Sequence, residues 1–166
     1  MMILPLSKGA FTVVDDDDYE ACTEFKWSLA ECSGKFYAKR QWVDATLGTP
    51  GVCCSVYLHR FLTKWSFVDH LNGISLDNRR SNLRPATATQ NAQNRDGLEG
   101  TRSGFKGVFW HAASQSWNAR ITADRRTHSL RYYSNPEEAA RAYDRAALRL
   151  HGEFARTNFP KEDYLS

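Results

Sequence analysis

Hydrophobic and polar residues alternate in the second half of the chain, and a longer helical repeat follows them. The alternating stretches are residues 105–111, 116–122 and 127–133. Period-two alternation is typical of half-buried strands. Residues 135–152 instead predict a helix, because Asn135 and Pro136 suit a first turn and Gly152 an end. Small or apolar residues share one side of this helix: Ala139, Ala140, Tyr143, Ala147 and Leu150. The pattern predicts three antiparallel strands backed by a helix.

The same alternation assigns the strand residues to two faces of the predicted sheet. The residues expected to face the helix are Val108, Trp110, Trp117, Ala119, Ile121 and Leu130. The residues expected to face outward are Phe109, His111, Asn118, Arg120, Thr122, Ser129 and Arg131. One face is therefore apolar and packed, while the other is available for binding.

The first half shows shorter patterns and leads to a mixed α+β fold class. Residues 35–40 and 53–60 alternate like short strands, and residues 15–27 begin with four aspartates. Carboxylates suit the positive end of a helix, so this run predicts a solvated helix start. A metal site is the weaker alternative, because four consecutive carboxylates cannot all face one ion. The glycine-rich run over residues 94–104 reads as a linker.

A polar segment, residues 68–95, carries the candidate chemistry. Asn72 and Gly73 predict a tight turn after a short strand. Thr87 and Gln90 predict the capped start of a helix. Two short strands and a helix would bring four side chains together, namely Asp69, His70, Asn82 and Asn91.

Positive charge is concentrated in two separate segments of the chain. The net charge of the 166 residues is +3. Residues 58–95 hold 6 Lys/Arg against 2 Asp/Glu, and residues 101–134 hold 6 against 1. Two basic segments suggest two surfaces that meet one polyanion, such as the phosphates of a nucleic acid. Two solvated faces are the alternative.

Composition argues against a membrane protein, a secreted protein and a zinc-binding protein. No apolar run approaches the ~20 residues that span a bilayer, and the N-terminus lacks the pattern of a signal peptide. The chain is therefore expected to be cytoplasmic, with no membrane partner. The cysteines, Cys22, Cys32, Cys53 and Cys54, lack the spacing of a zinc site and are expected to be small buried thiols.

The polar segment contains the groups that phosphodiester hydrolysis needs. Such a reaction requires a base for the attacking water and neutralisation of phosphoryl charge. His70 suits the base, since its ordinary pKa is ~6.5. Asp69 and the Asn91 carbonyl are hard oxygen ligands for Mg²⁺. Asn82 is expected to hydrogen-bond His70 and fix its proton. Adjacent strand residues point to opposite faces, so Asp69 and His70 share a site only if the strand ends or bends there.

Residues 103–160 resemble the plant ethylene-response-factor (Apetala-type, ERF) DNA-binding domain. The resemblance rests on KGV (106–108), WNARI (117–121), the long helix and TNFP (157–160). It implies that the sheet enters the major groove of DNA. The residues that depart from the family pattern are Phe109, His111, Thr122 and Ser129, so the target sequence does not carry over. The residues left for phosphates or guanine edges are Lys106, Arg120, Arg125, Arg126 and Arg131.

Residues 55–95 resemble the HNH homing endonucleases of the phage ββα-metal type. The matching residues are LHR (58–60), VDH (68–70), NG (72–73), DNRRSNL (77–83) and QN (90–91). The resemblance implies that His70 is the general base, that Asn82 orients it, and that Asp69 and Asn91 bind metal. Asparagine at position 91, where the motif ends in histidine, favours Mg²⁺, with Mn²⁺ as an alternative, over zinc.

Together these features predict a metal-dependent HNH endonuclease (residues 1–97), a linker (98–104) and an ERF-like DNA-binding domain (105–160). Its expected partner is double-stranded DNA in a phage-infected or prokaryotic cell, with no small-molecule cofactor, as a monomer or homodimer. The rival hypothesis is a non-catalytic DNA-binding regulator. The residues expected to contact nucleic acid are His59, Arg60, Arg79, Arg80, Arg95, Lys106, Phe109, His111, Asn118, Arg120, Thr122, Arg126, Ser129 and Arg131. His59 is equally well interpreted as a core histidine.

Overall fold

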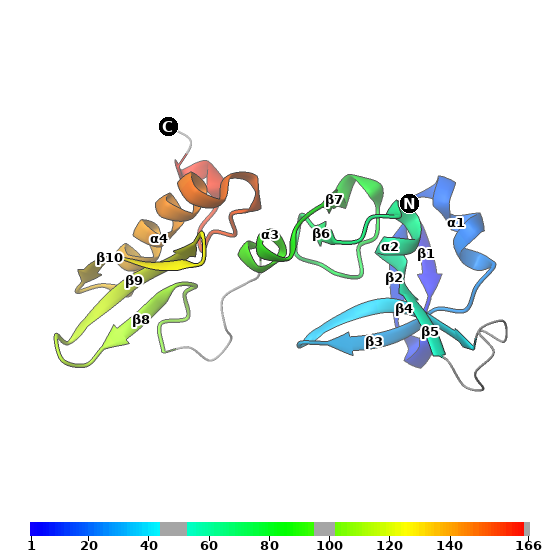
Figure 1. The fold of residues 1–166 in the computed structure, drawn as a ribbon, viewed down its shortest axis with the longest axis horizontal. Coiled ribbons are helices and arrows are strands. Elements are labelled where there is room, and N and C mark those ends of the chain that lie inside the picture. The colour runs from blue at the N-terminus through cyan, green and yellow to red at the C-terminus, as the bar shows by residue number, and fades with distance from the viewer. Residues whose placement is uncertain (44–52, 95–101, 165–166) are drawn as a thin grey trace. The chain divides into compact units, whose positions relative to one another are not determined.

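A computed structural model describes residues 1–43, 53–94 and 102–164 and has a mixed α+β fold (Figure 1). This confirms the predicted class, α+β, at that level. The chain divides into two compact units, Met1–Ala88 and Thr89–Ser166. Within the described residues, no helix is both long and apolar enough to cross a membrane. The predicted division at residues 97 and 105 stays a prediction, since most of the linker lies outside the described residues.

The first unit is built from short antiparallel sheets and small helices. Its elements are β1 (Met2–Pro5), η1 (Ser7–Gly9), β2 (Phe11–Val14), α1 (Asp16–Thr23), β3 (Ser28–Cys32), β4 (Lys35–Val43), β5 (Cys53–Tyr57), α2 (Leu58–Thr63), β6 (Val68–His70), η3 (Arg80–Asn82) and β7 (Leu83–Pro85). The strands pair as β1-β2, β3-β4-β5 and β6-β7. The predicted strand over residues 53–60 is therefore half right, because its last residues begin α2.

A hydrophobic core joins the N-terminal hairpin, α1, β4 and α2. Its buried members are Leu4, Leu6, Val14, Cys22, Trp27, Ala38, Leu58 and Leu62. They come from both strands of the N-terminal hairpin, from α1, from β4 and from α2, so each small sheet is stabilised by its neighbours rather than alone. Cys22 fits the expectation of a buried thiol, and burial raises its pKa to about 11. Cys32 and Cys53 are exposed, so that expectation is wrong for them.

The segment between β6 and β7 is attached to strand β2. Val13 N donates to Leu76 O at 2.9 Å, and Asn78 N donates to Val13 O at 2.8 Å. These bonds form a parallel bridge between Val13 and Asp77. The N-terminal hairpin therefore holds the polar loop that follows His70, although 55 or more residues separate them in the sequence.

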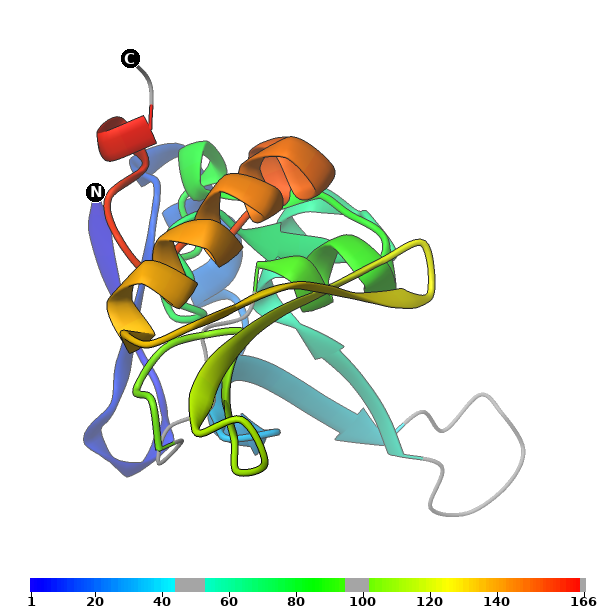
Figure 2. The same ribbon diagram turned by 90° about the vertical axis from the view of Figure 1, so that its left-hand side faces the viewer.

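The second unit is a three-stranded antiparallel sheet covered on one face by a long helix, as predicted (Figures 1 and 2). Its elements are β8 (Val108–His111), β9 (Ser116–Ala123), β10 (Arg126–Tyr133), α4 (Pro136–His151), η4 (Gly152–Phe154) and η5 (Lys161–Tyr164). Helix α3 (Ala88–Gln93) starts at the last residue of the first unit. The Asn135 side chain accepts a hydrogen bond from Glu137 N and caps α4. Leu150, expected in the core, is 42% exposed.

A buried aspartate fixes the chain after α4. Asp144 is fully buried, and its carboxylate accepts hydrogen bonds from Asn158 N at 2.8 Å and Phe159 N at 3.0 Å. It also accepts from the Tyr164 hydroxyl at 2.9 Å. Hydrogen bonds to a buried carboxylate offset its desolvation. The TNFP segment is thus held against the helix, which explains its place in the sequence pattern.

Candidate active site and nucleic-acid interface

His70 ends strand β6 and is 7% exposed. Its Nε2 lies 3.4 Å from the Oδ1 of Asn78. Burial lowers the pKa of His70, and the hydrogen bond to Asn78 and the charge of Asp69 oppose that shift only in part. The imidazole is therefore neutral near pH 7, which is the form that a general base must have.

Asp69 forms a buried ion pair with Arg84. The two residues lie opposite each other in the β6–β7 pairing. The carboxylate Oδ2 of Asp69 accepts hydrogen bonds from Arg84 Nε at 2.8 Å and Nη2 at 2.7 Å. Their side chains are 8% and 10% exposed, respectively. The pair compensates two charges that would be costly to bury separately, and sequence reasoning did not single out Arg84.

Asp69 and His70 hydrogen-bond to different segments, as expected for neighbours along a strand. Asp69 bonds to Arg84 on β7, whereas His70 bonds to Asn78 in the loop. Strand β6 does end at His70, which is the condition under which the two can serve one site.

Asn82 braces the loop and does not make the bond to His70 that the sequence predicted. Its Oδ1 accepts from Asn72 N at 2.9 Å, and its Nδ2 donates to Asp77 O at 2.8 Å. The amide thus ties both ends of the turn together. The asparagine at His70 is instead Asn78. Sequence reasoning missed it because its other partner, Thr12, is 66 residues away and leaves no local pattern.

His59 lies in the core beside His70, which is one of the two interpretations that the sequence left open. It is 7% exposed, and its ring meets the His70 ring edge-on at 5.2 Å between centroids. It also stacks on Tyr57 at 5.5 Å. Burial, the nearby His70 and Arg60 lower the pKa of His59 to about 3. A buried, neutral imidazole is a poor contact for phosphate, so the core interpretation is favoured.

Two of the arginines expected to bind nucleic acid are paired within the protein. Arg79 donates to both carboxylate oxygens of Asp77, at 2.8 and 2.7 Å. Arg80 does the same with Asp18, at 2.8 and 2.7 Å. The aspartate run does begin a helix, α1, as predicted, with Asp16 and Asp17 exposed and Asp18 paired with Arg80. Arg60 is exposed on α2 and lies near the rings of Tyr57 and Phe67.

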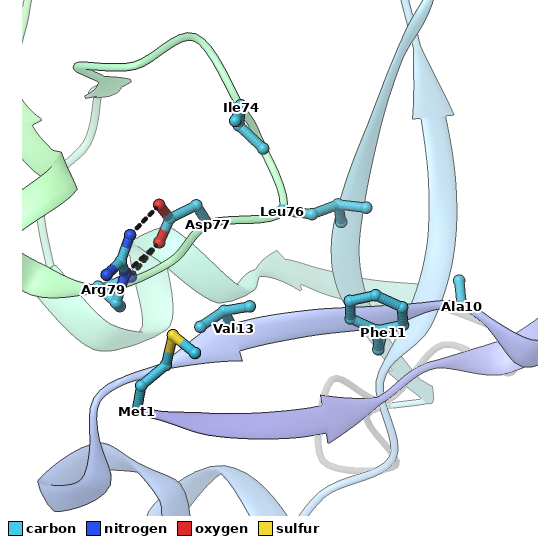
Figure 3. Close-up of a pocket in the computed structure, with 8 residues that line it drawn as sticks. All are labelled: Met1, Ala10, Phe11, Val13, Ile74, Leu76, Asp77 and Arg79. Atoms are coloured by element: carbon cyan, nitrogen blue, oxygen red, sulfur yellow. Dashed lines mark hydrogen bonds and ion pairs between the residues drawn. The ribbon is translucent and has the colours of Figure 1, made fainter.

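A largely apolar pocket of about 450 Å³ lies between the loop and the N-terminal hairpin (Figure 3). Its lining residues are Met1, Ala10, Phe11, Val13, Ile74, Leu76, Asp77 and Arg79. The Asp77–Arg79 ion pair provides its polar groups (Figure 3). Because that pair is satisfied internally, the pocket offers packing surface rather than chemistry.

The pairing of Asp69 and Asn91 as metal ligands stays a prediction. Asn91 is partly buried on α3, which falls mainly in the second unit. Its expected place beside Asp69 therefore stays a prediction. Across residues 1–43, 53–94 and 102–164, no three His, Cys, Asp or Glu side chains are placed to hold an ion. Arg95 lies outside the described residues.

The outward face of the second unit's sheet is organised around Asn118. This side chain is fully buried although it faces outward by alternation. Its Oδ1 accepts from Arg120 Nε, and its Nδ2 donates to Ser129 Oγ at 2.8 Å and Arg131 O at 3.1 Å. Arg120 also lies 5.7 Å from the centre of the Phe109 ring. Asn118 therefore holds Arg120 in place instead of reaching out to a ligand itself.

The expected orientation of Arg131 is wrong, because a β-bulge interrupts β10 between Ser129 and Arg131. Arg131 pairs with Ala119, a residue of the helix-facing side, and Tyr132 pairs with the outward Asn118. Directly opposed residues share a face of the sheet. The extra residue of the bulge thus exchanges an expected arginine for a tyrosine on the outer face.

The remaining residues that were predicted to contact nucleic acid differ in their exposure and in their hydrogen bonds. Thr122 and Ser129 are exposed on the outer face, with Thr122 bonded to Thr127 at 3.1 Å. His111 bonds to Ser114 through Nδ1 at 2.7 Å and lies against Tyr132. Lys106 donates to Gln93 O at 2.6 Å. Arg126 is exposed and pairs with Ala123 beside the turn at Asp124 and Arg125.

Comparison with known proteins agrees with this arrangement. The AP2 domain family matches residues 103–153. A protein of Acanthamoeba polyphaga mimivirus, named "Uncharacterized HNH endonuclease L560", is 30% identical over 165 residues, which cover 94% of this chain and 79% of that protein. "Protein 3.8" of Escherichia phage T7 is 33% identical over 95 residues, covering 57% of this chain and 78% of that protein. This chain therefore belongs to the HNH endonuclease family and carries an AP2/ERF-type DNA-binding domain in its second half.

Proposed function

We propose that this protein is a metal-dependent endonuclease that hydrolyses phosphodiester bonds in double-stranded DNA. The observation that carries the proposal is His70, a buried, neutral imidazole that ends a strand immediately after an acidic residue. Membership of the HNH endonuclease family and the AP2 match support it. The first unit supplies the base for the hydrolysis, and the sheet of the second unit holds the DNA.

His70 acts as the general base. It takes a proton from a water molecule, whose oxygen forms a bond to phosphorus while the bond from phosphorus to the 3′ oxygen breaks. The leaving oxygen then takes a proton from solvent. Burial keeps the imidazole neutral and so ready to accept the proton. His59, also neutral, packs against the ring and limits its rotation.

The donor atoms suit Mg²⁺, with Mn²⁺ as an alternative. Asp69 and Asn91 would hold the ion through a carboxylate and an amide oxygen, which are hard ligands. Magnesium sites in enzymes commonly use one or two carboxylates and keep several waters, so a small donor set fits the ion. When bound, it neutralises charge on the phosphate and on the leaving oxygen. Arg84 holds one oxygen of Asp69 and so orients the carboxylate.

The AP2 sheet binds DNA through its outer face. Arg120, held by Asn118 and lying near Phe109, is the cation at the centre of that face. Cleavage is of the homing type. A monomer with one active site nicks one strand, whereas a homodimer on a symmetric target cuts both.

Conversion of supercoiled plasmid to nicked circles tests the proposal. Cleavage by the full chain should require Mg²⁺ and stop in excess chelator. His70→Ala should lower the rate by ~10²–10⁴-fold, while its DNA affinity stays unchanged. His128→Ala is the matched control, because His128 is an exposed histidine on β10. Equal rates for the parent and His70→Ala would contradict the assignment of the base.

The rival hypothesis is a non-catalytic DNA-binding regulator. It is favoured by the engagement of Asp69 with Arg84 and by the covering of His70. A parent protein that binds plasmid tightly but cleaves with neither Mg²⁺ nor Mn²⁺ would establish that function instead.

A further inference from the structure

A buried chain of hydrogen bonds runs from the N-terminal hairpin to His70. The Thr12 hydroxyl donates to Leu76 O at 2.6 Å, and Asn78 Nδ2 donates to Thr12 Oγ1 at 2.7 Å. Asn78 Oδ1 then faces His70 Nε2 at 3.4 Å. Thr12 is fully buried and Asn78 is 1% exposed. Buried amides and hydroxyls with this many partners have one favourable orientation.

The direction of this chain determines which nitrogen of His70 carries the proton. A carbonyl oxygen only accepts, so the Thr12 hydroxyl must donate its one proton to Leu76 O. Its oxygen is then left to accept, and only the amide nitrogen of Asn78 donates. The network therefore assigns the Asn78 amide with its oxygen toward His70. Since that oxygen also only accepts, the hydrogen bond requires a proton on Nε2 of the neutral ring.

We infer that Thr12 and Asn78 are positioning residues that hold His70 as the Nε2-protonated tautomer, so that Nδ1 is the nitrogen that accepts the proton of water. The part concerning water rests on the proposed function, whereas the part concerning the tautomer does not. This gives the N-terminal hairpin a role, because strand β2 supplies Thr12 as well as the backbone bonds of Val13 to the same loop.

Backbone hydrogen bonds hold Thr12 and Asn78 rigidly beside each other. Leu76 O accepts from both Val13 N, at 2.9 Å, and the Thr12 hydroxyl. Asn78 N donates to Val13 O at 2.8 Å, on the other side of the bridge. Asn78 therefore has its backbone and its side chain fixed to the same strand, which leaves its amide little freedom to turn. A neutral histidine in the wrong tautomer presents an N–H to water and cannot act as the base.

The tautomer is measured directly on the full chain. Nitrogen-15 NMR of histidine-labelled protein, recorded above the pKa of the ring, distinguishes a protonated Nε2 from a protonated Nδ1 in His70. We expect the Nε2-protonated form in the parent. Thr12→Val should add the other tautomer and lower kcat about tenfold with KM unchanged, as expected for one lost neutral hydrogen bond. Thr12→Ser should restore both readouts.

Thr23→Val is the matched control, since Thr23 also donates to a backbone carbonyl of the first unit, Glu20 O at 2.7 Å, but is exposed at the end of α1 and is no member of the hydrogen-bond chain to His70. It should change neither readout. An Nδ1-protonated His70 in the parent would overturn the inference, even if Thr12→Val failed to fold. An unchanged tautomer and kcat in folded Thr12→Val would overturn it too. If the parent did not cleave DNA, the proposed function would fail, and the NMR signal would still decide the tautomer.

Discussion

At the scale of single residues, the Asp69–Arg84 ion pair links stability to metal binding. Arg84→Gln leaves a buried carboxylate without its cation, which we expect to lower the free energy of unfolding by ~3 kcal/mol. If Asp69 is a metal ligand, an ion will offset part of that loss. Mg²⁺ should therefore raise the midpoint of denaturant unfolding more in Arg84→Gln than in the parent. Equal shifts in the two proteins would exclude Asp69 as a ligand.

The buried His59 makes the first unit sensitive to acid. The pKa of His59 is lowered in the folded protein to about 3, whereas in the unfolded chain it is ~6.5. The unfolded state therefore binds more protons between these values, and folding stability falls as the pH drops below about 6.5. At pH 5 this group alone lowers stability by ~2 kcal/mol relative to pH 7.

His59→Phe keeps an aromatic ring but removes the titrating group. Unfolding by denaturant at pH 7 and pH 5 should show a smaller loss on acidification in His59→Phe than in the parent. His128→Ala, which changes an exposed histidine, should behave like the parent. The same acid loss in His59→Phe and in the parent would contradict the assignment of the shift to His59.

At the scale of elements, the contact between α4 and the start of β8 depends on Gly107. Gly107 has a φ of +74°, and a Cβ there would lie 2.1 Å from the ring of Tyr143 on α4. We expect Gly107→Ala to destabilise the second unit by ~3 kcal/mol or more, through strain and overpacking. Gly104→Ala is the matched control. Gly104 has a φ of +69° but nothing within 4 Å, so only ~1 kcal/mol of backbone strain is expected. Similar losses in the two variants would show that the helix contact does not matter.

Elements with a strong local pattern were predictable from the sequence, and long-range hydrogen bonds were not. Alternation and capping gave β8, β9, β10 and α4 within a few residues, because their signals are local. The bulge before Arg131 escaped prediction, since one extra residue shifts the alternation without altering composition. At the candidate site, chemistry alone singled out His70 as the proposed base, but it did not single out Asn78 or Thr12. Their bonds join segments that only the folded chain brings together.

At the scale of the whole molecule, the proposed function divides binding and chemistry between the two units. The second unit carries the outer face with Arg120, and the first carries His70. Both basic segments were expected to meet DNA, but Arg79 and Arg80 in the first unit are neutralised by aspartates. The electrostatic part of DNA binding should therefore depend mainly on the second unit.

The salt dependence of DNA binding tests this division with two arginines of β9 and β10. Arg120→Gln in the full chain should weaken affinity and reduce the slope of log affinity against log salt by ~0.9, the value for one lost phosphate contact on duplex DNA. Arg131→Gln removes the same charge, but the bulge places Arg131 opposite helix-facing Ala119, so its slope should match the parent. Plasmid nicking at saturating DNA should be unchanged in both variants, because neither residue belongs to the first unit, which supplies the base. Equal slopes for all three proteins would mean that the outer face does not hold DNA. A lower slope for Arg131→Gln alone would mean that the sheet binds DNA from a different side.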